Sequence, residues 1–242
     1  MSGMLSVVQK DRIHLVADAA FYDPDTGILT GIGPKIWPFP KINAAFSSRG
    51  SALSFPLFRH LLEAIELATF DDFVSVAPDA FQSLYSMLGA ETCEVMVAGF
   101  STARDRPEVY WWCNHKGWDG LEPGNVYRLE GVSQFGLDRD DLPSAEAFTP
   151  TDAVSAFQKG REHLSDLHCG AADVPFMAHA IGGGVLHIEL TADGCNGSWL
   201  HEWPDVIGEK IDPLRDEQPA VDWRQGRTTP AGCPLGAAQL AA

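Results

Sequence analysis

The sequence predicts a layered α+β fold, with two antiparallel sheets between helical layers in a four-layer αββα order. Three observations lead to this prediction. Segments with strand patterns occur near both ends of the chain and bracket the helical segments. A short polar turn joins the first two strands, which favours antiparallel pairing. The helical segments form two groups far apart in the chain, so each sheet can have its own helical cover.

The first part of the chain is expected to contain a hairpin and a long loop. Apolar residues indicate strands at 4–9 and 12–18, and polar residues 10–12 predict the turn between them. Glycine, proline and aspartate recur through 19–43, which we expect to be irregular. Small residues at 43–48 indicate another short strand.

Two helices are predicted next, both on the same sheet. Apolar residues recur at intervals of three and four over 51–68, and Ser51 is the expected N-cap. The second helix is expected over 72–88, where Pro78 starts or kinks the main body and Gly89 follows the C-terminus.

The second half of the chain is expected to complete both sheets. Apolar patterns predict central strands at 93–100, 107–114 and 125–130. A helix capped by Thr151 is expected over 151–167, on the opposite sheet from the first two helices. Two late strands are predicted at 176–191 and near 198–203.

The length and composition fit one acidic globular domain. From residue 208 the chain is polar and rich in proline and glycine, so we expect a domain over 1–207 and an irregular tail over 208–242. Seventeen Lys and Arg residues against 33 Asp and Glu residues give a formal net charge of −16. This balance argues against nucleic acid or an anionic membrane as a partner. No membrane span or secretory signal is visible, so we expect a cytoplasmic protein.

Cysteine and histidine spacing indicates neither a metal site nor another cofactor. The five cysteines include no C-x-x-C pair, and we expect reduced thiols. Cys113 and His115 share one strand face, as do His187 and Glu189, but a third and fourth ligand cannot be placed beside either pair.

The strongest chemical candidate is Ser2. A small residue after Met1 permits removal of the methionine, which would make Ser2 the N-terminus. A terminal serine carries a hydroxyl and an α-amino group in one residue. That amine, with an ordinary pKa of about 7.7–8.0, can act as the base for the hydroxyl.

Such a nucleophile needs a nearby cation to lower the pKa of the amine and an acid to hold that cation. Asp18 ends the second predicted strand, and the hairpin returns it beside Ser2. Lys35 follows a glycine-rich loop and is the candidate cation. An Asp at a strand end and a Lys after a loop are common, and spacing alone favours a structural role for them.

The chain also resembles the proteasome-type N-terminal nucleophile (Ntn) hydrolases, which include proteasome β subunits and their bacterial relatives. The resemblance covers about residues 2–205. An apolar-Ala-Asp segment ends at Asp18, at the family's interval from the nucleophile, and a Lys-Ile pair begins at Lys35. A small-residue strand then leads into a long helix, and a late Gly-Gly-Val strand at 183–185 is followed by an Asp-Gly turn.

The resemblance implies roles for six residues. Ser2 is implied to be the nucleophile, Lys35 to tune proton transfer, and Asp18 to orient Lys35. Ser48 aligns with the oxyanion-hole glycine of the family. The family places Asp and Ser before the Gly-Gly pair to support the amine, whereas His179 and Gly182 stand there in this chain. Ser133 is the candidate for the remaining supporting serine.

Two functions follow as alternatives. The first is a hydrolase that cleaves peptide or other linear amide bonds through an acyl-enzyme on Ser2. The second is a catalytically inactive protein of the same fold that serves as an assembly or binding subunit. In either case we expect a homo-oligomer, because the fold presents helical faces to neighbours. For the enzyme, the expected partner is a peptide or small amide substrate.

Overall fold

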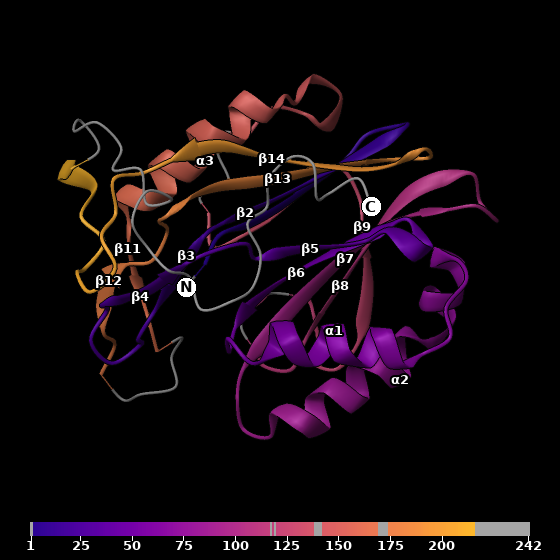
Figure 1. The fold of residues 1–242 in the computed structure, drawn as a ribbon, viewed down its shortest axis with the longest axis horizontal. Helices are drawn as coiled ribbons and strands as arrows, with labels where there is room; N and C mark the ends of the chain where they lie inside the picture. Colours follow the sequence, from indigo (N-terminus) through magenta and orange to yellow (C-terminus); the bar gives the residue numbers. More distant parts are fainter. Residues whose placement is uncertain (1, 117, 119, 138–141, 169–173, 216–242) are drawn as a thin grey trace.

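A computed structural model of the chain describes residues 2–116, 118, 120–137, 142–168 and 174–215. Two five-stranded antiparallel sheets dominate it (Figure 1). The first has the order β10-β1-β2-β13-β14, with strands at Val132–Phe135, Met4–Val8, Arg12–Asp18, Gly184–Thr191 and Gly194–Glu202. The second has the order β5-β6-β7-β8-β9, with strands at Ile36–Phe39, Ala44–Gly50, Cys93–Ser101, Arg106–Cys113 and Val126–Leu129.

Three helices pack on these sheets. Helices α1 (Ser54–Ala64) and α2 (Phe70–Leu88) share a buried cluster with β6, β7 and β8 of the second sheet. Helix α3 (Pro150–Glu162) packs through Phe157 on the first sheet. A third cluster, which includes Met96 and Trp111, fills the space between the two sheets. Figure 1 shows α3 on one side of the molecule and the α1–α2 pair on the other.

The predicted N-terminal hairpin is confirmed, and its register positions the start of the chain. β1 pairs with β2 with Met4 opposite Ala17. Asp18, the last residue of β2, lies opposite Val185 of β13 on its other side. The register therefore brings residues 2 and 3 beside Asp18, in the middle of the first sheet rather than at its edge.

The expectation of a loop over 19–43 was wrong, because this segment contains three short strands and a turn of 3-10 helix. β3 (Ala20–Tyr22) and β4 (Leu29–Ile32) form a two-stranded sheet, β5 joins the second large sheet, and η1 spans Pro40–Ile42. β5 lies at the edge of its sheet. An edge strand tolerates Pro38, because the backbone N–H that proline lacks is not needed to pair with a second strand. The turn residues were correctly recognised, but they separate strands.

Helix ends differ from those predicted because the capping residues differ. Ser51 is not the cap of α1: the helix begins three residues later, after Leu53. Thr69 caps α2 in a capping box with Asp72, and α2 continues through Pro78. Thr149, rather than Thr151, caps α3 in a capping box.

Helix α3 ends at Glu162, so the predicted helix was too long. A two-stranded sheet of β11 (Leu164–Asp166) and β12 (Met177–His179) follows it. The predicted strand at 176–191 is in fact two strands, β12 and β13. Gly183, with φ of +73°, lies between them, and Gly184, with φ of +156°, begins β13; residues with side chains rarely adopt either conformation.

The start of the predicted tail packs on the domain. Gly208 donates a backbone hydrogen bond to Leu29, and Ile211 is buried beside β3 and β4. A short 3-10 helix, η4, covers Pro213–Arg215, and another, η3, covers Ala145–Ala147. Residues 216–242 lie outside the described part of the chain. Within the described part, no helix is long and apolar enough to span a membrane.

Candidate active site

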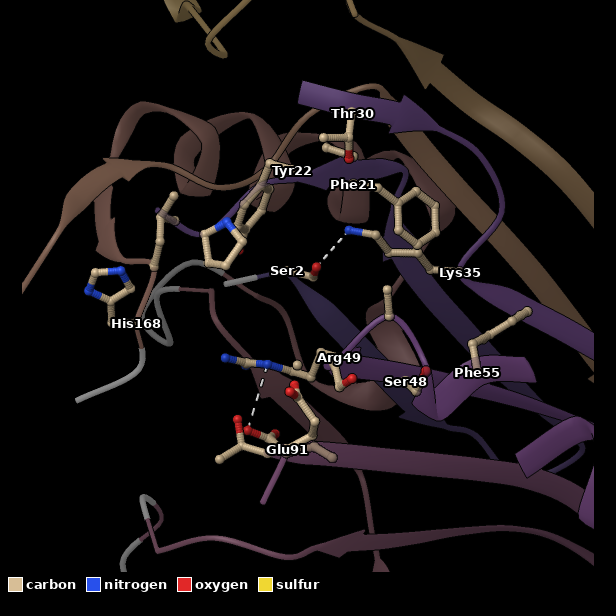
Figure 2. A pocket seen from close by; sticks show the side chains of 18 of the residues that line it. Ser2, Phe21, Tyr22, Thr30, Lys35, Ser48, Arg49, Phe55, Glu91 and His168 are labelled. Carbon is tan, nitrogen blue, oxygen red and sulfur yellow. Dashed lines mark hydrogen bonds and ion pairs between the residues drawn. The ribbon is translucent and has the colours of Figure 1, made fainter. Parts of the chain in front are cut away.

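Ser2, Asp18 and Lys35 meet at the end of the N-terminal hairpin. The Lys35 ammonium donates to the Ser2 hydroxyl oxygen at 2.6 Å and to Asp18 Oδ2 at 2.9 Å. All three side chains are buried, with Asp18 fully covered and Lys35 4% exposed. Figure 2 shows Lys35 and Ser2 pointing toward each other across the opening of a cavity.

The Asp18 carboxylate has a donor on every side. Oδ1 accepts from the backbone N–H of Gly3 at 3.0 Å, and Oδ2 accepts from the N–H of Ala20 at 3.0 Å as well as from Lys35. These bonds satisfy a buried carboxylate at the point where β2 ends and the chain turns into β3. They also hold the residue that follows Ser2.

Lys35 lies between β4 and β5, where the loop passes over the hairpin. Gly33 donates a backbone hydrogen bond to Ala19, which fixes the loop two residues before Lys35. The Phe21 ring lies 5.2 Å from the ammonium. Burial lowers the pKa of Lys35, Asp18 opposes that effect, and the charge of Arg49 lowers the pKa further.

These groups line a cavity of about 670 Å³. Phe21, Tyr22 and Thr30 form one side, and Ser48 and Arg49 form the other (Figure 2). Strand pairing leaves two backbone edges beside this cavity in the described structure. The β5–β6 register ends with Ile36 opposite Ser47, so the rest of β6 has no β5 partner. β3 pairs only with β4.

Ser48 lies in the same cavity as Ser2, as the sequence led us to expect. It belongs to β6 opposite Val95 of β7. Its hydroxyl forms a hydrogen bond at 3.1 Å with the Ser54 hydroxyl at the start of α1. That bond ties the strand to the helix, next to the open edge of β6.

Ser133 and His179 do not line this cavity. Ser133 lies in β10 opposite Ser6, four residues along the strand from Ser2. His179 lies in β12, with Nδ1 2.9 Å from the Arg161 carbonyl oxygen. The structure therefore brings together four of the six candidate residues and places these two elsewhere.

A buried ion pair that the sequence analysis did not identify lies behind Gly182–Gly184. Arg161 of α3 contacts both carboxylate oxygens of Asp205, at 2.9 and 2.8 Å. Asp205 Oδ2 also accepts from the N–H of Gly183 at 2.7 Å. The neighbouring Gly182 carbonyl accepts from Ala19, so this pair supports the backbone next to Asp18.

Arg49 was also missed, although it lies in the cavity with Ser2. It is 3% exposed, and its Nε lies 3.7 Å from Glu94 Oε1 on the adjacent strand. His115 Nε2 is 3.2 Å from the same oxygen. The signal available in the sequence was a charged residue at the end of a strand of small and apolar residues.

The described residues contain no cluster of three or more His, Cys, Asp and Glu side chains arranged for a metal ion. The Cys113 Sγ donates to the His115 carbonyl, and burial raises the pKa of this thiol to about 11. His187 contacts His14 rather than Glu189, which pairs with Arg12. Cys93, Cys113 and Cys195 are free thiols, and the other two cysteines lie outside the described residues.

Comparison with known proteins identifies the fold. No protein-family model matches the sequence, and no curated protein matches it. Among solved structures, a Gly-1 mutant of Anbu from Hyphomicrobium sp. strain MC1 matches 83% of this chain and 87% of its own, with a TM-score of 0.56. Anbu is a bacterial proteasome-like protein of the Ntn fold. The fold of this chain is proteasome-like.

The likeness to Anbu is one of architecture, since the two sequences are 11% identical. It agrees with the family resemblance expected from the spacing of Asp18 and Lys35. In this proteasome-like fold, Ser2 before β1 and Lys35 before β5 line one cavity, and Asp18 at the end of β2 contacts Lys35. The chemistry of that cavity depends on its own side chains.

Proposed function

We propose that this protein is an Ntn hydrolase that cleaves peptide or other linear amide bonds with Ser2 as the nucleophile, after removal of Met1. The observation that carries the proposal is the buried contact of Lys35 with both Ser2 and Asp18, at 2.6 and 2.9 Å. We further propose that the packing of α3, the two sheets and the α1–α2 pair is the four-layer αββα sandwich of that family.

The proposed reaction begins with transfer of the Ser2 hydroxyl proton to the α-amino group of the same residue. The hydroxyl oxygen attacks the carbonyl carbon of the substrate and forms a tetrahedral intermediate. The carbon–nitrogen bond then breaks, and the departing amine takes the proton. Water hydrolyses the resulting ester on Ser2 and restores the free hydroxyl.

Lys35 and Asp18 support the first step by electrostatics. A positive charge on Lys35 disfavours a second positive charge on the nearby amine, so more of that amine is free base at neutral pH. Asp18 holds Lys35 in place through a buried ion pair. The oxyanion of the intermediate would accept from the backbone N–H at Ser48, and one such donor contributes about 2.7–4 kcal/mol.

An extended peptide fits the two open backbone edges beside the cavity. The end of β6 lies on one side and β3 on the other, and a strand placed between them would form main-chain hydrogen bonds to both. Side chains of the peptide would alternate between the cavity and solvent. This arrangement favours a linear peptide over a compact small amide as substrate.

The alternative proposal is a non-catalytic subunit of the same fold. Its support is the position of Ser133 and His179, neither of which lines the cavity, so the second half of the family's amine support is not assembled. For both proposals we expect self-association. Leu53, Tyr85 and Met87 on or beside α1 and α2 are 45–58% exposed, which favours an interface between copies.

Hydrolysis of a panel of fluorogenic N-acetyl-tripeptide amides tests the enzyme proposal. The protein is produced with a cleavable leader that leaves Ser2 as the first residue. We expect turnover by this protein and none by Ser2→Ala, which keeps the fold and the amine but lacks the hydroxyl. Equal turnover by both proteins would reject Ser2 as the nucleophile. Intact folding of both with no turnover on any peptide would support the non-catalytic subunit.

A further inference from the structure

Arg49 is a second buried cation beside Ser2, in addition to Lys35. It lies on β6, where alternate residues face opposite sides: Phe46 packs toward α1 and Ala45 packs between the sheets. By this period of two, Arg49 faces the space between the sheets, as Ala45 does. Its side chain lines the cavity that Ser2 and Lys35 also line (Figure 2).

Gly136 shows how closely Arg49 approaches the start of the chain. A Cβ atom at Gly136 would lie 2.6 Å from the Ser2 carbonyl oxygen and 3.0 Å from Arg49 Nη1. The Ser2 carbonyl and the Arg49 guanidinium therefore both lie close to Gly136, and a side chain at position 136 would collide with them. The guanidinium lies next to the backbone of the proposed nucleophile rather than at the mouth of the cavity.

The Arg49 side chain contacts Glu94 and Trp118, and His115 in turn contacts Glu94. Glu94 of β7 lies 3.7 Å from Nε, and the Trp118 ring centroid lies 5.6 Å from the guanidinium carbon. His115, which follows β8, contacts the same Glu94 oxygen at 3.2 Å. Burial would raise the pKa of Glu94, but Arg49 and His115 hold that pKa below its usual value, so Glu94 stays charged.

We propose that Arg49 is a positioning residue for the nucleophile: its guanidinium, held by Glu94, adds a second fixed positive charge beside Ser2 and so disfavours protonation of the Ser2 α-amine. The inference rests on the proposed Ntn hydrolase function and adds a residue to its mechanism. The same charge also acts on Lys35, whose titration therefore reports it. Arg49 is not assigned a contact with substrate. Asp18 opposes this effect on Lys35 from the other side.

The direct readout is the titration of Lys35 itself, which does not require activity. The chain has six lysines, so selective ¹³Cε labelling of lysine gives a simple NMR spectrum. The signal that disappears in Lys35→Arg assigns Lys35. Arg49→Gln should raise the titration midpoint of Lys35 by about one pH unit, since a like charge close by has been removed. Arg49→Lys keeps the charge and should leave the midpoint near that of the unmodified chain.

Arg59→Gln is the matched control, because it removes the same charge from the exposed surface of α1, where Arg59 pairs with Glu63. It should leave the Lys35 midpoint unchanged. If Arg49→Gln fails to fold with Glu94 left unpaired, Arg49→Gln/Glu94→Gln removes both charges. It should give a smaller upward shift, because loss of the Glu94 carboxylate lowers the Lys35 midpoint. No shift in any folded variant that replaces Arg49 with Gln, or an equal shift in Arg59→Gln, would overturn the proposal.

The rate of Ser2 acylation separates this inference from the proposed function. In Arg49→Gln, the pH profile of acylation should move to higher pH by the same amount as the Lys35 midpoint. A shifted Lys35 midpoint without acylation of any variant would reject the hydrolase but keep the electrostatic role of Arg49. Acylation with unshifted profiles and midpoints would keep the hydrolase and reject the role of Arg49.

Discussion

The Asp18 carboxylate accepts a hydrogen bond from the Gly3 backbone N–H at 3.0 Å, so the acid that holds Lys35 also fixes the residue directly after Ser2. In Asp18→Asn, the side-chain NH₂ would face one of the donors that Asp18 now accepts from, and Lys35 would lose its buried counter-charge. We expect the free energy of unfolding to fall by about 3–5 kcal/mol, as measured by urea denaturation. Asp18→Asn/Lys35→Met should recover part of the loss, whereas a change below about 1 kcal/mol for Asp18→Asn would show that the pair is not buried as described.

Replacement of Lys35 tests its role in proton transfer. Lys35→Ala should slow acylation of Ser2 by about 10²–10⁴-fold, the usual contribution of a group that assists acid–base chemistry. Lys35→Arg keeps a positive charge, but a planar guanidinium is larger than the buried ammonium between Ser2 and Asp18, so it should not restore the rate. Stopped-flow or timed mass measurements of acylation provide the check. An unchanged rate in Lys35→Ala would remove Lys35 from the mechanism.

Gly136→Ala and Gly131→Ala should differ in both stability and acylation. Gly136 and Gly131 both have positive φ, of +73° and +62°, but a Cβ at Gly136 would collide with the Ser2 carbonyl oxygen, whereas nothing lies within 4 Å of one at Gly131. Gly131→Ala should therefore cost only the backbone strain, about 1–2 kcal/mol. Gly136→Ala should cost more and should also abolish acylation, because Ser2 must move. Equal stability and equal acylation of the two variants would contradict the described position of Ser2.

A buried histidine pair predicts how stability depends on pH. Gln9 donates its amide N–H to the Ala145 and Phe148 carbonyls, so its Oε1 faces His14 Nε2 as an acceptor. His14 Nδ1 then accepts from His187 Nε2 at 2.9 Å. Burial, and then His14, lower the pKa of His187 to about 4. Both rings are thus neutral in the folded protein.

In the unfolded chain His187 titrates near its ordinary pKa of 6.5, so between about pH 6.5 and 4 the unfolded state binds more protons. The free energy of unfolding should therefore be steady above pH 6.5 and fall as the pH drops toward 4, by up to about 3 kcal/mol from this residue. His187→Gln should flatten the curve in that window. A slope that persists in the variant would assign the effect to other groups.

The sequence was sufficient for those parts of the fold that depend on local pattern. The β1–β2 hairpin and the position of Asp18 follow from alternating apolar residues and one short turn, because the register of a hairpin is set by that turn. The position of Lys35 was expected from the family resemblance, since no local pattern brings the loop before β5 to the hairpin. β4 and β5 were missed because Gly31 and Pro38 lie within them, and strand formation there depends on a partner distant in sequence.

The rest of the candidate site depends on pairing between distant strands. Glu94 reaches Arg49, and His115 reaches Glu94, only because β6, β7 and β8 follow one another in one sheet, which no local pattern specifies. His179 was a candidate by its position before the Gly-Gly pair. It lies elsewhere because the chain between β12 and β13 turns at Gly183, so that His179 pairs with Leu164 of β11.

Covalent labelling of the mature chain with a peptide epoxyketone tests the central claim most directly. The hydroxyl of an N-terminal residue attacks the ketone of this reagent, and the α-amine of the same residue opens its epoxide. Mass spectrometry should find one reagent on Ser2 of the chain that begins at Ser2, and none on Ser2→Ala or on the chain that keeps its leader. An unmodified mature chain, or an adduct on another residue, would contradict an N-terminal nucleophile at Ser2.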